Sequence, residues 1–462
     1  MAELRLDRIA ETTGGTILQG PPERIFHAFS IDSRLTTPGE LFFAIVARRD
    51  GHDFVAAAAE RGAAGAVVSR SVPSVAGDFA LLQVPDTLRA LQILAKKVLK
   101  ERSLKVVGIT GSVGKTTTKE FTAALLSRKF RVLKSEGNFN NHLGLALTLL
   151  CLETRHDAAV LEMGMSAPGE IRTLTEIAPP DVAVITNISP VHLEFLKTME
   201  TIAAAKKEIL EGMKTDGIAV LNGDDPFVEK IAQARNGRKI FFGFSRGCDI
   251  RVENLQRLGY DGFKFDLVLD SDRRRIRFPF LSETYIYNLL AAVGVSRALS
   301  LSLDEIEHGI QDLKPYAKRG LLLRLAKKIV VIDDSYNSNP RALEAALRNY
   351  AALPARRHVA VLGDMLELGE AAAKFHEDAG QQAERFGWDL LVTVGPLSRH
   401  MAGGARRAGM GMDRILSFAT GEDAAAQVSA LLREGDLVLV KGSRGIRTET
   451  IVETLKEIFK ET

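Results

Sequence analysis

The sequence predicts an α/β protein of three domains, and three observations support this prediction. The chain has 462 residues, which is room for about three domains of ordinary size. Short apolar segments of strand length alternate with helix-length segments over most of the chain, a pattern typical of parallel sheets covered by helices. The glycine-rich segment 110–118 directly follows an apolar strand candidate and opens into a helical pattern, as phosphate-binding loops do.

Residues 1–98 form the first predicted domain, a small α/β unit. Its strand-like runs and Ala-rich helical segments mix within fewer than a hundred residues, and a charged segment at 100–105 marks a linker to the next strand. The predicted strands are 25–31, 41–45, 64–68 and 80–84, and the predicted helices are 54–61 and 88–99.

Residues 99–312 form the predicted central domain, a doubly wound parallel sheet of the phosphate-loop type. Four apolar strand candidates alternate with helices there, at 106–110, 158–162, 182–187 and 218–222. Residues 238–280 differ in pattern. Their alternating segments at 263–269 and 275–280 predict an antiparallel patch before a helix at 286–299.

Residues 313–462 form the third predicted domain, which is Rossmann-like because strands and helices alternate again. It contains no G-x-G-x-x-G, so we expect no dinucleotide site in it. The predicted strands are 329–333, 358–362, 390–394 and 437–440.

Composition excludes several classes of protein. Hydrophobic residues make up 46% and charged residues 26% of the chain, which argues against disorder. A net charge of +3 gives no reason to expect nucleic acid or a membrane surface as a partner. No apolar run reaches 18 residues, and the N-terminus lacks a signal-peptide core. Cys151 and Cys248 lie far apart without metal-ligand spacing, so we expect a reduced, cytoplasmic protein.

The segment 110–117 is the strongest functional motif. Glycines let backbone N–H groups approach an anion, Lys115 can reach β- and γ-phosphate oxygens, and the Thr116 hydroxyl can ligate Mg²⁺. ATP or GTP is therefore the expected ligand. The general pattern G-x-x-x-x-G-K-[ST] is not met, because Ile109 stands where its first glycine belongs. The candidate nucleotide-binding residues are Thr110, Gly111, Ser112, Val113, Gly114, Lys115, Thr116 and Thr117.

Two further residues are candidate metal ligands because they follow strands of the same predicted sheet. Glu162 ends one strand, and His192 follows the next, so both belong at the edge where parallel α/β sheets bind ligands. The alternatives are a solvated carboxylate and a structural histidine.

Lys206 lies on the apolar stripe of a predicted helix at 201–213, with Ile202, Ile209 and Met213. Burial should lower the pKa of its amine, and a neutral amine can react with CO₂ to give a carbamate, a carboxylate-like metal ligand. The pattern alone favours the alternative, a lysine whose ammonium reaches solvent.

Three loops carry polar side chains that suit a polar ligand. Asn138, Asn140 and Asn141 cluster in the segment 137–144, although a turn would use such amides too. Residues 333–340 form a strand-to-helix loop, and 441–444 places two basic groups after another strand, where they could hold a carboxylate or phosphate. A solvated loop is the alternative for the last two.

Taken together, these motifs resemble those of the Mur ligases, the ATP-dependent amide-forming enzymes of bacterial cell-wall synthesis, whose phosphate loop has the form T-G-[ST]-x-G-K-T-[ST]. The likeness extends from about residue 30 to 445 and is closest to the members that add D-alanyl-D-alanine to UDP-N-acetylmuramoyl-tripeptide. The segments that carry it are 110–117, 137–141, 162–164, 169–171, 186–188, 192–194, 205–209, 333–340, 363–369 and 441–444.

The resemblance implies catalytic and cofactor roles. Lys115 and Thr116 would hold ATP phosphates and Mg²⁺, and Lys206 would be carbamylated, which reverses the preference from the pattern alone. The implied catalytic residues are Lys115, Glu162, His192, Lys206 and Arg319. The implied metal ligands are Thr116, Glu162, His192 and Lys206. For the rest of the nucleotide, the resemblance assigns Asn288 to adenine, Arg319 to the phosphates and Asp334 to the ribose.

The resemblance also implies two groups of substrate contacts. In the first domain, the uridine-nucleotide site would comprise Ser30, Asp32, Ser33, Arg34, Asp50, Gly51 and His52. The peptide and the incoming dipeptide would be met by Asn138, Asn141, Tyr336, Asn337, Asn339, Lys441, Ser443 and Arg444. The implied partners are small molecules, with no nucleic acid and no membrane insertion, and a monomer is expected.

Three positions depart from the family pattern. Thr284-Tyr285 replaces His-Asn before Asn288, the segment 47–49 is one residue short and lacks a glycine, and Lys197-Thr198 replaces Gly-Ser. Three alternatives stay open at this point: a sister ligase that adds a single amino acid, a folylpolyglutamate-type synthetase, and a non-catalytic nucleotide-binding regulator.

Overall fold

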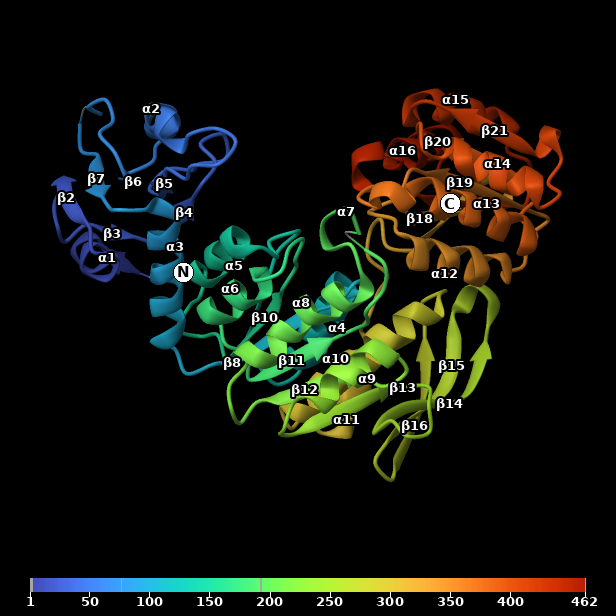
Figure 1. The fold of residues 1–462 in the computed structure, drawn as a ribbon, viewed down its shortest axis with the longest axis horizontal. Helices are drawn as coiled ribbons and strands as arrows, with labels where there is room; N and C mark the ends of the chain where they lie inside the picture. The colour runs from blue at the N-terminus through green and yellow to red at the C-terminus, as the bar shows by residue number, and fades with distance from the viewer. Residues whose placement is uncertain (1–2, 76, 192, 462) are drawn as a thin grey trace.

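The computed structural model describes residues 3–75, 77–191 and 193–461, and in these parts of the chain three large sheets lie in a row (Figure 1). The first lies at the N-terminal end, the second in the middle and the third at the C-terminal end. A small antiparallel pair, β1 (Leu4–Arg5) with β3 (Ile25–Phe26), accompanies the first sheet.

The first sheet has five strands in the order β2-β7-β6-β5-β4, parallel except for β2. The single strand expected at 25–31 is wrong. The chain changes partner between Phe26 and Phe29, so β3 pairs with β1 and β4 joins the main sheet beside β5. The elements are α1 (Leu6–Thr13), β2 (Thr16–Gln19), β4 (Phe29–Ser30), β5 (Leu41–Phe43), α2 (Val55–Glu60), β6 (Gly65–Val68), β7 (Ala80–Gln83) and α3 (Thr87–Lys100).

The central sheet has nine strands in the order β16-β15-β14-β13-β12-β11-β8-β10-β9. Strands β9 to β14 are parallel, and β14, β15 and β16 continue the same sheet antiparallel, so the expected patch is an extension of the sheet. The strands are β8 (Lys105–Thr110), β9 (Val132–Lys134), β10 (Ala158–Glu162), β11 (Val182–Ile185), β12 (Ile218–Asn222), β13 (Lys239–Gly243), β14 (Ile250–Arg257), β15 (Phe263–Leu269) and β16 (Asp272–Phe278).

Helices cover the central sheet because the parallel strands are apolar on both faces, as the wholly buried β10, β11 and β12 show. Helix α10 packs on α4, which starts at the phosphate loop, and α3 of the first unit packs on α5. The helices are α4 (Lys115–Leu126), α5 (His142–Leu150), α6 (Glu170–Ile177), α7 (Leu193–Leu196), α8 (Met199–Gly212), α9 (Pro226–Gln233), α10 (Glu283–Ala298) and α11 (Leu303–Gln311).

The third sheet has six strands in the order β17-β18-β22-β19-β20-β21, parallel except for β17. Its elements are β17 (Leu321–Leu325), β18 (Ile329–Asp334), α12 (Pro340–Ala351), β19 (Arg357–Gly363), α13 (Ala372–Arg385), β20 (Leu390–Val394), α14 (Arg399–Arg407), β21 (Ile415–Phe418), α15 (Gly421–Leu431), β22 (Asp436–Lys441) and α16 (Glu449–Phe459). None of the helices in the described ranges combines the length and the apolar character needed to cross a bilayer.

Candidate active site

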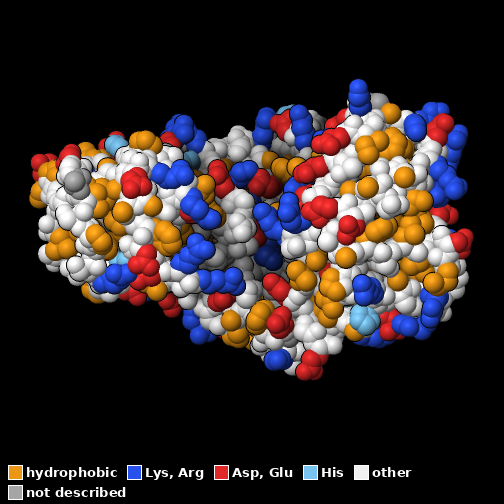
Figure 2. All heavy atoms as spheres, turned by 90° about the horizontal axis from the view of Figure 1, so that it is seen from above, with side chains coloured by type: hydrophobic (Ala, Val, Ile, Leu, Met, Phe, Trp, Pro, Cys, Tyr) orange, Lys and Arg blue, Asp and Glu red, His pale blue; other side chains and the backbone are white. Residues whose placement is uncertain are grey.

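The carboxyl ends of strands from two sheets meet at one cleft of about 680 Å³. Loops after β8, β10, β11 and β12 line it from the central sheet, and loops after β18 and β22 line it from the third sheet. Figure 2 shows the molecule hollowed near its middle, with Lys and Arg side chains gathered around the hollow. Such crevices at strand ends are where open α/β sheets bind ligands.

The phosphate loop is packed so closely that two of its positions require glycine. A Cβ on Gly111 would lie 1.8 Å from Thr186 Oγ1, and a Cβ on Gly114 would lie 2.2 Å from Asn288 Oδ1. Both glycines also have positive φ, 150° and 87°. Asn288, assigned by resemblance to adenine, therefore lies against the phosphate loop as well as lining the cleft.

The Asn187 side chain holds the loop by both its polar atoms. Its Oδ1 accepts from Val113 N at 3.0 Å, and its Nδ2 donates to Val113 O at 2.8 Å. Helix α4 then begins at Lys115, so its first N–H groups and its dipole face the cleft, an arrangement that favours an anion.

Lys115 lies among several charged groups. Its Nζ donates to Gly111 O at 2.8 Å and to Ser112 O at 3.4 Å. Burial lowers the pKa of this ammonium, the carboxylate of Glu162 opposes that change, and the positive charge of Arg319 adds to it. The cation is therefore held close to both the loop and the strand-end carboxylate.

Arg319 comes from the third unit and reaches the phosphate loop. Its Nη2 donates to Thr116 Oγ1 at 3.1 Å, and its guanidinium carbon lies 3.8 Å from the centre of the Tyr336 ring. The guanidinium of Arg444 lies 5.4 Å from the same ring. Tyr336 thus holds two cations at the mouth of the cleft by cation–π contacts.

Glu162 is a buried carboxylate with one oxygen that lacks a partner in the described part of the chain. Its Oε1 accepts from Asn140 Nδ2 at 3.0 Å, and its backbone N–H donates to Ser135 Oγ at 3.2 Å. A buried carboxylate oxygen without a hydrogen bond is costly unless a ligand satisfies it, so Oε2 fits a bound cation.

Of the four expected metal ligands, the structure describes three. Thr116 and Glu162 line the same cleft, and Lys206 is buried in α8. His192 lies outside the described residues. Within the described ranges, no cluster of three or more His, Cys, Asp and Glu side chains forms a ready metal centre.

Lys206 lies on the apolar stripe of α8 and is only 2% exposed, beside buried Ile202 and Ile209, whereas the pattern alone favoured an ammonium that reaches solvent. Burial lowers the pKa of its amine well below the usual value, and the positive charge of Lys115 lowers it further. An ammonium that reaches solvent is therefore wrong for this structure, and burial shifts the amine toward its neutral, nucleophilic form.

The loop after β18 faces the cleft with Asp334, Tyr336, Asn337 and Asn339. Lys441 Nζ, from the end of β22, donates to Asp334 Oδ2 at 2.7 Å and to Asn337 O at 3.0 Å, which ties the two loops together. The Asn339 side chain caps α12 by accepting from Ala342 N. The third unit thereby presents amide, carboxylate and cationic groups opposite the phosphate loop.

Several expected substrate residues do not reach this cleft. Ser443 is buried and its Oγ accepts from Leu366 N, so in this structure it supports the neighbouring loop, and its contact with the peptide stays a prediction. Asn138 is exposed, and Asn141 caps α5, so neither lines the cleft. Thr110 and Gly111 are buried beneath the phosphate loop.

The expected uridine-site residues gather at the carboxyl ends of β4, β5 and β6, apart from the central cleft. There Arg34 Nε donates to Asp32 Oδ1 at 2.9 Å, and Ser30 Oγ lies 3.1 Å from Thr36 Oγ1. A Cβ on Gly51 would lie 2.6 Å from the backbone N and O of Ile45, so the loop packs closely.

His52 supports this loop through both nitrogens. Its Nδ1 lies 2.5 Å from Asp50 Oδ1, and its Nε2 accepts from Ser69 N at 2.8 Å. The backbone N–H of His52 is the main cause that lowers the pKa of Asp50. With 3% exposure and both ring nitrogens engaged, His52 positions the loop and leaves no free nitrogen for a ligand.

Sequence reasoning missed an aromatic wall of the cleft. Phe244 follows β13 and Tyr287 lies on α10, and their rings are 4.8 Å apart between centres. Tyr287 Oη donates to Asp224 Oδ2 at 2.9 Å. Thr284 and Tyr285, where the family pattern has His-Asn, also line the cleft. The position of Phe244 after a strand was the available signal, but β13 itself was not predicted.

Comparisons with known proteins agree with this geometry. The Mur ligase middle domain matches residues 109–296, and the Mur ligase glutamate ligase domain matches residues 319–444. The UDP-N-acetylmuramoyl-tripeptide–D-alanyl-D-alanine ligase of Bacillus subtilis is 35% identical over 460 residues, which cover 99% of both chains.

Solved structures extend the similarity to the whole fold. The crystal structure of MurF from Acinetobacter baumannii matches with a TM-score of 0.90 and 30% identity over 99% of each chain. MurF ligase from Thermotoga maritima in complex with ADP matches with a TM-score of 0.82 and 31% identity, over 93% of this chain and 97% of that one.

Proposed function

This chain belongs to the Mur ligase family, and we propose that it is the ligase that joins D-alanyl-D-alanine to UDP-N-acetylmuramoyl-tripeptide with ATP. The products are the UDP-N-acetylmuramoyl-pentapeptide, ADP and phosphate. The observation that carries this function is the single cleft that places the phosphate loop opposite the loops at 334–339 and 441–444. Full-length similarity to ligases of this specificity rules against the sister ligases and the folylpolyglutamate-type enzymes.

The first step is phosphorylation of the carboxylate that ends the tripeptide. The γ-phosphoryl group gathers charge in the transition state, and positive groups placed around it lower the barrier. Lys115 and Arg319 approach the loop from opposite units and supply such charge, while the backbone N–H groups that open α4 bind phosphate oxygens. ATP use agrees with the ADP complex of the T. maritima relative.

The second step is attack of the dipeptide amine on the acyl phosphate. The amine forms a bond to the acyl carbon, the tetrahedral intermediate collapses, and the C–O bond to phosphate breaks. Tyr336, Asn337 and Asn339 from the third unit, with Lys441 and Arg444, offer polar groups to hold the dipeptide beside the phosphate loop. Holding both reactants in one cleft lowers the entropic cost of the reaction and keeps water from the acyl phosphate.

The donor set at the phosphate loop fits a magnesium ion. The orphaned Oε2 of Glu162 and the hydroxyl of Thr116 are the oxygen ligands that Mg²⁺ prefers, and His192 is the further expected ligand. When bound there, Mg²⁺ neutralises charge on the phosphates.

Each of the three units has its own substrate in this proposal. Residues 1–98 bind the UDP part through the loops after β4 and β5, residues 99–312 bind ATP, and residues 313–462 bind the dipeptide. The enzyme is proposed to act as a monomer in the cytoplasm. Its cysteines are unpaired, Cys151 exposed and Cys248 buried, which fits a reducing compartment.

Lys206 is proposed to carry a carbamate. Its amine is buried and its pKa is lowered, so its neutral form can attack CO₂, forming an N–C bond and releasing one proton, and the product is a carboxylate-like group beside Lys115. Purified protein in ¹³C-bicarbonate should show a carbamate ¹³C resonance that Lys206→Ala lacks. The variant should lose turnover, and a short carboxylic acid should partly restore it. Full activity of Lys206→Ala, or no carbamate signal in the wild type, would contradict this assignment.

The function is tested by mass spectrometry of the nucleotide product. Incubation with ATP, UDP-N-acetylmuramoyl-tripeptide and D-Ala-D-Ala should give the pentapeptide nucleotide. A product carrying a single added amino acid, formed only when free amino acids replace the dipeptide, would move the chain to a sister ligase.

A further inference from the structure

The carboxylate of Asp225 joins three segments that lie far apart in the sequence. It is 2% exposed. Its Oδ1 caps α9 by accepting from Phe227 N and Val228 N, at 3.1 and 3.2 Å. Its Oδ2 accepts from Ile188 N at 2.9 Å and from Arg341 Nη1 at 3.3 Å. Of these groups, Arg341 alone belongs to the third unit.

The segment held by Asp225 is bound directly to the phosphate loop. Ser112 Oγ donates to Ser189 O at 3.0 Å, and Ser189 N donates back to Ser112 Oγ at 2.9 Å. Ser112 and Ser189 are both buried, so these bonds are shielded from water. Ile188, whose N–H donates to Asp225, directly precedes Ser189 in the chain. Arg341 is therefore connected to the phosphate loop through Asp225 and then through the segment Ile188-Ser189.

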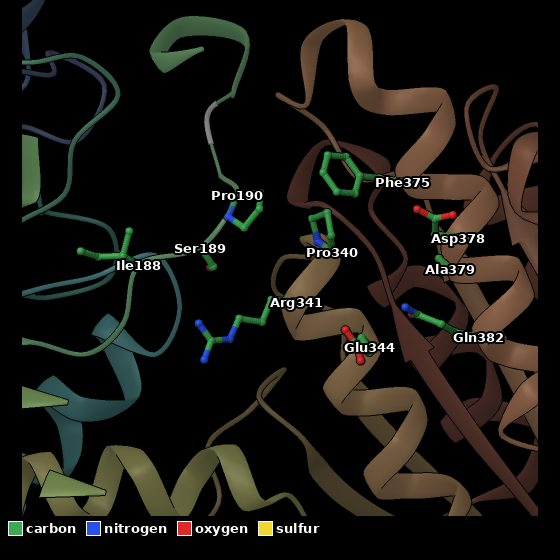
Figure 3. Close-up of a pocket in the computed structure, with 10 residues that line it drawn as sticks. All are labelled: Ile188, Ser189, Pro190, Pro340, Arg341, Glu344, Phe375, Asp378, Ala379 and Gln382. Atoms are coloured by element: carbon green, nitrogen blue, oxygen red, sulfur yellow. The ribbon is translucent and has the colours of Figure 1, made fainter. Parts of the chain in front are cut away.

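Arg341 is the second residue of α12, after Pro340, and it lines the cleft next to the loop at 335–339. Figure 3 shows its side chain extending from the start of α12 toward the segment with Ile188 and Ser189. A cavity of about 400 Å³, lined by Pro190, Pro340 and Phe375 among others, lies between the two units beside this contact. Beside this cavity, Arg341 connects the third unit with the central unit where apolar side chains do not pack against each other.

The other end of α12 has its own anchor on the central unit. Arg257, at the end of β14, donates from Nη2 to Asn349 Oδ1 at 2.9 Å and from Nη1 to Asn349 O at 3.2 Å. Residues 341 and 349 are about 12 Å apart along a helix. Two anchors at this separation fix the direction of α12, so losing the one at Arg341 leaves the helix free to tilt about Arg257.

We propose that Arg341 is a positioning residue for the second chemical step. Through Asp225 it sets the start of α12, and hence the loop at 335–339 that holds the incoming dipeptide, over the phosphate loop. This inference rests on the proposed function. The side chain of Arg341 is about half exposed, so its contact with Asp225 can break and re-form as the units separate and close.

The test separates the two chemical steps. Hydroxylamine attacks an acyl phosphate and releases phosphate, so hydroxamate formed from ATP and UDP-N-acetylmuramoyl-tripeptide reports the first step without the dipeptide. Dipeptide-dependent turnover reports both steps. Arg341→Ala should raise the KM for D-Ala-D-Ala about fivefold while hydroxamate formation stays within about twofold of wild type. Arg341→Lys should recover part of the loss.

Two further variants control the experiment. Asp225→Asn keeps an oxygen to cap α9 but removes the charge, and it should raise the same KM. The double variant Asp225→Asn with Arg341→Ala should be no worse than the worse single variant, because both remove one contact. Arg406→Ala, an exposed arginine on α14, should match wild type.

Three outcomes would overturn the inference. Arg341→Ala could keep the wild-type KM, it could lose both reactions equally, or its effect could add fully to that of Asp225→Asn. A wild-type enzyme that forms hydroxamate but shows no dipeptide-dependent turnover would overturn the proposed function as well, so the two failures are distinguishable.

Discussion

Lys115 is the residue at which the charges of the cleft meet. Its ammonium contacts two carbonyl oxygens of its own loop, the charges of Glu162 and Arg319 shift its pKa in opposite directions, and its own charge lowers the pKa of Lys206. A single methionine at this position would keep the apolar stem and remove the charge, so it isolates the electrostatic contribution.

We expect Lys115→Met to lower kcat by about 10²-fold or more, because a preorganised cation at a developing phosphoryl charge contributes on that scale. Steady-state phosphate release measures this effect. Lys374→Met, on an exposed and ion-paired lysine of α13, is the matched control and should keep wild-type kcat. An active Lys115→Met enzyme would exclude the phosphate role of this lysine.

Glu162→Gln replaces an oxygen that has no hydrogen-bond partner among the described residues with an amide and removes one negative charge. We expect the Mg²⁺ concentration for half-maximal activity to rise about tenfold or more, as loss of a metal-site group does. A Mg²⁺ titration of turnover checks this prediction, with exposed Glu176→Gln of α6 as control. The same half-saturating concentration in Glu162→Gln and wild type would refute a metal at this carboxylate.

At the scale of elements, the loops after β12 and β13 and helix α10 form one wall of the cleft. Asp224, after β12, accepts from Phe244 N and Ser245 N and from Tyr287 Oη. Desolvation raises the pKa of this carboxyl, but the hydrogen bonds from Phe244, Ser245 and Tyr287 outweigh it, and the net pKa is lowered.

This lowered pKa predicts an acid-dependent stability. The folded state favours the Asp224 carboxylate, so its stabilisation is present above the unfolded pKa of about 3.9 and is lost as the pH falls through the lower folded pKa. The difference in denaturant midpoint between wild type and Asp224→Asn should stay constant from about pH 7 to 5 and shrink below about pH 4. A gap that widens on acidification would show the opposite sign and contradict the assignment.

Tyr336 connects the loop after β18 with Arg319 and Arg444 through its ring. Tyr336→Phe keeps the ring and should retain turnover within about threefold, whereas Tyr336→Ala should lose about tenfold in kcat/KM for ATP, because Arg319 loses its platform. Kinetics of the two variants at varied ATP measure the contrast. Equal loss in both variants would mean that the hydroxyl, and not the ring, matters.

Sequence patterns predicted the elements whose signal is local. Strands β10, β12, β15 and β20 match the expected ranges, because β10, β12 and β20 are apolar runs of strand length and β15 alternates apolar with polar residues over most of its length. The short β9 and β13 were missed, since three to five mixed residues carry little pattern. The segment 25–31 was predicted as one strand but forms two, because β3 pairs with β1 and β4 pairs with β5. The periodicity of a sequence does not say which strands pair.

In the candidate site, too, features with a local sequence signal could be predicted and features that depend on distant partners could not. The phosphate loop and Glu162 could be predicted to lie together, because both stand at the carboxyl ends of parallel strands of the central sheet, and the loops at 334–339 and 441–444 could be grouped in the same way in the third sheet. That the two sheets meet at one cleft could not be predicted, because the strand pattern does not say how the units pack. Helical spacing placed Lys206 on the apolar stripe, but the pattern alone favoured an ammonium in solvent, and only the family resemblance reversed that preference. The structural roles of Ser443 and His52 could not be predicted, since their partners Leu366 and Ser69 lie far away in the sequence.

At the scale of the whole molecule, the three sheets in a row place the phosphate loop between two units that present different groups. The central and third units share one cleft, whereas the expected uridine site lies apart from it in the first unit. A long substrate with a nucleotide at one end and a peptide carboxylate at the other would span this distance. The arrangement therefore matches the shape of the proposed substrate.

The central claim is that one cleft activates the tripeptide carboxylate and delivers the dipeptide amine to it. Phosphate release from ATP by the purified protein, in Mg²⁺ and bicarbonate, tests this claim most directly. We predict sustained release only when UDP-N-acetylmuramoyl-tripeptide and D-Ala-D-Ala are both present. Release that is unaffected by the dipeptide, or that requires a single amino acid in its place, would contradict the account.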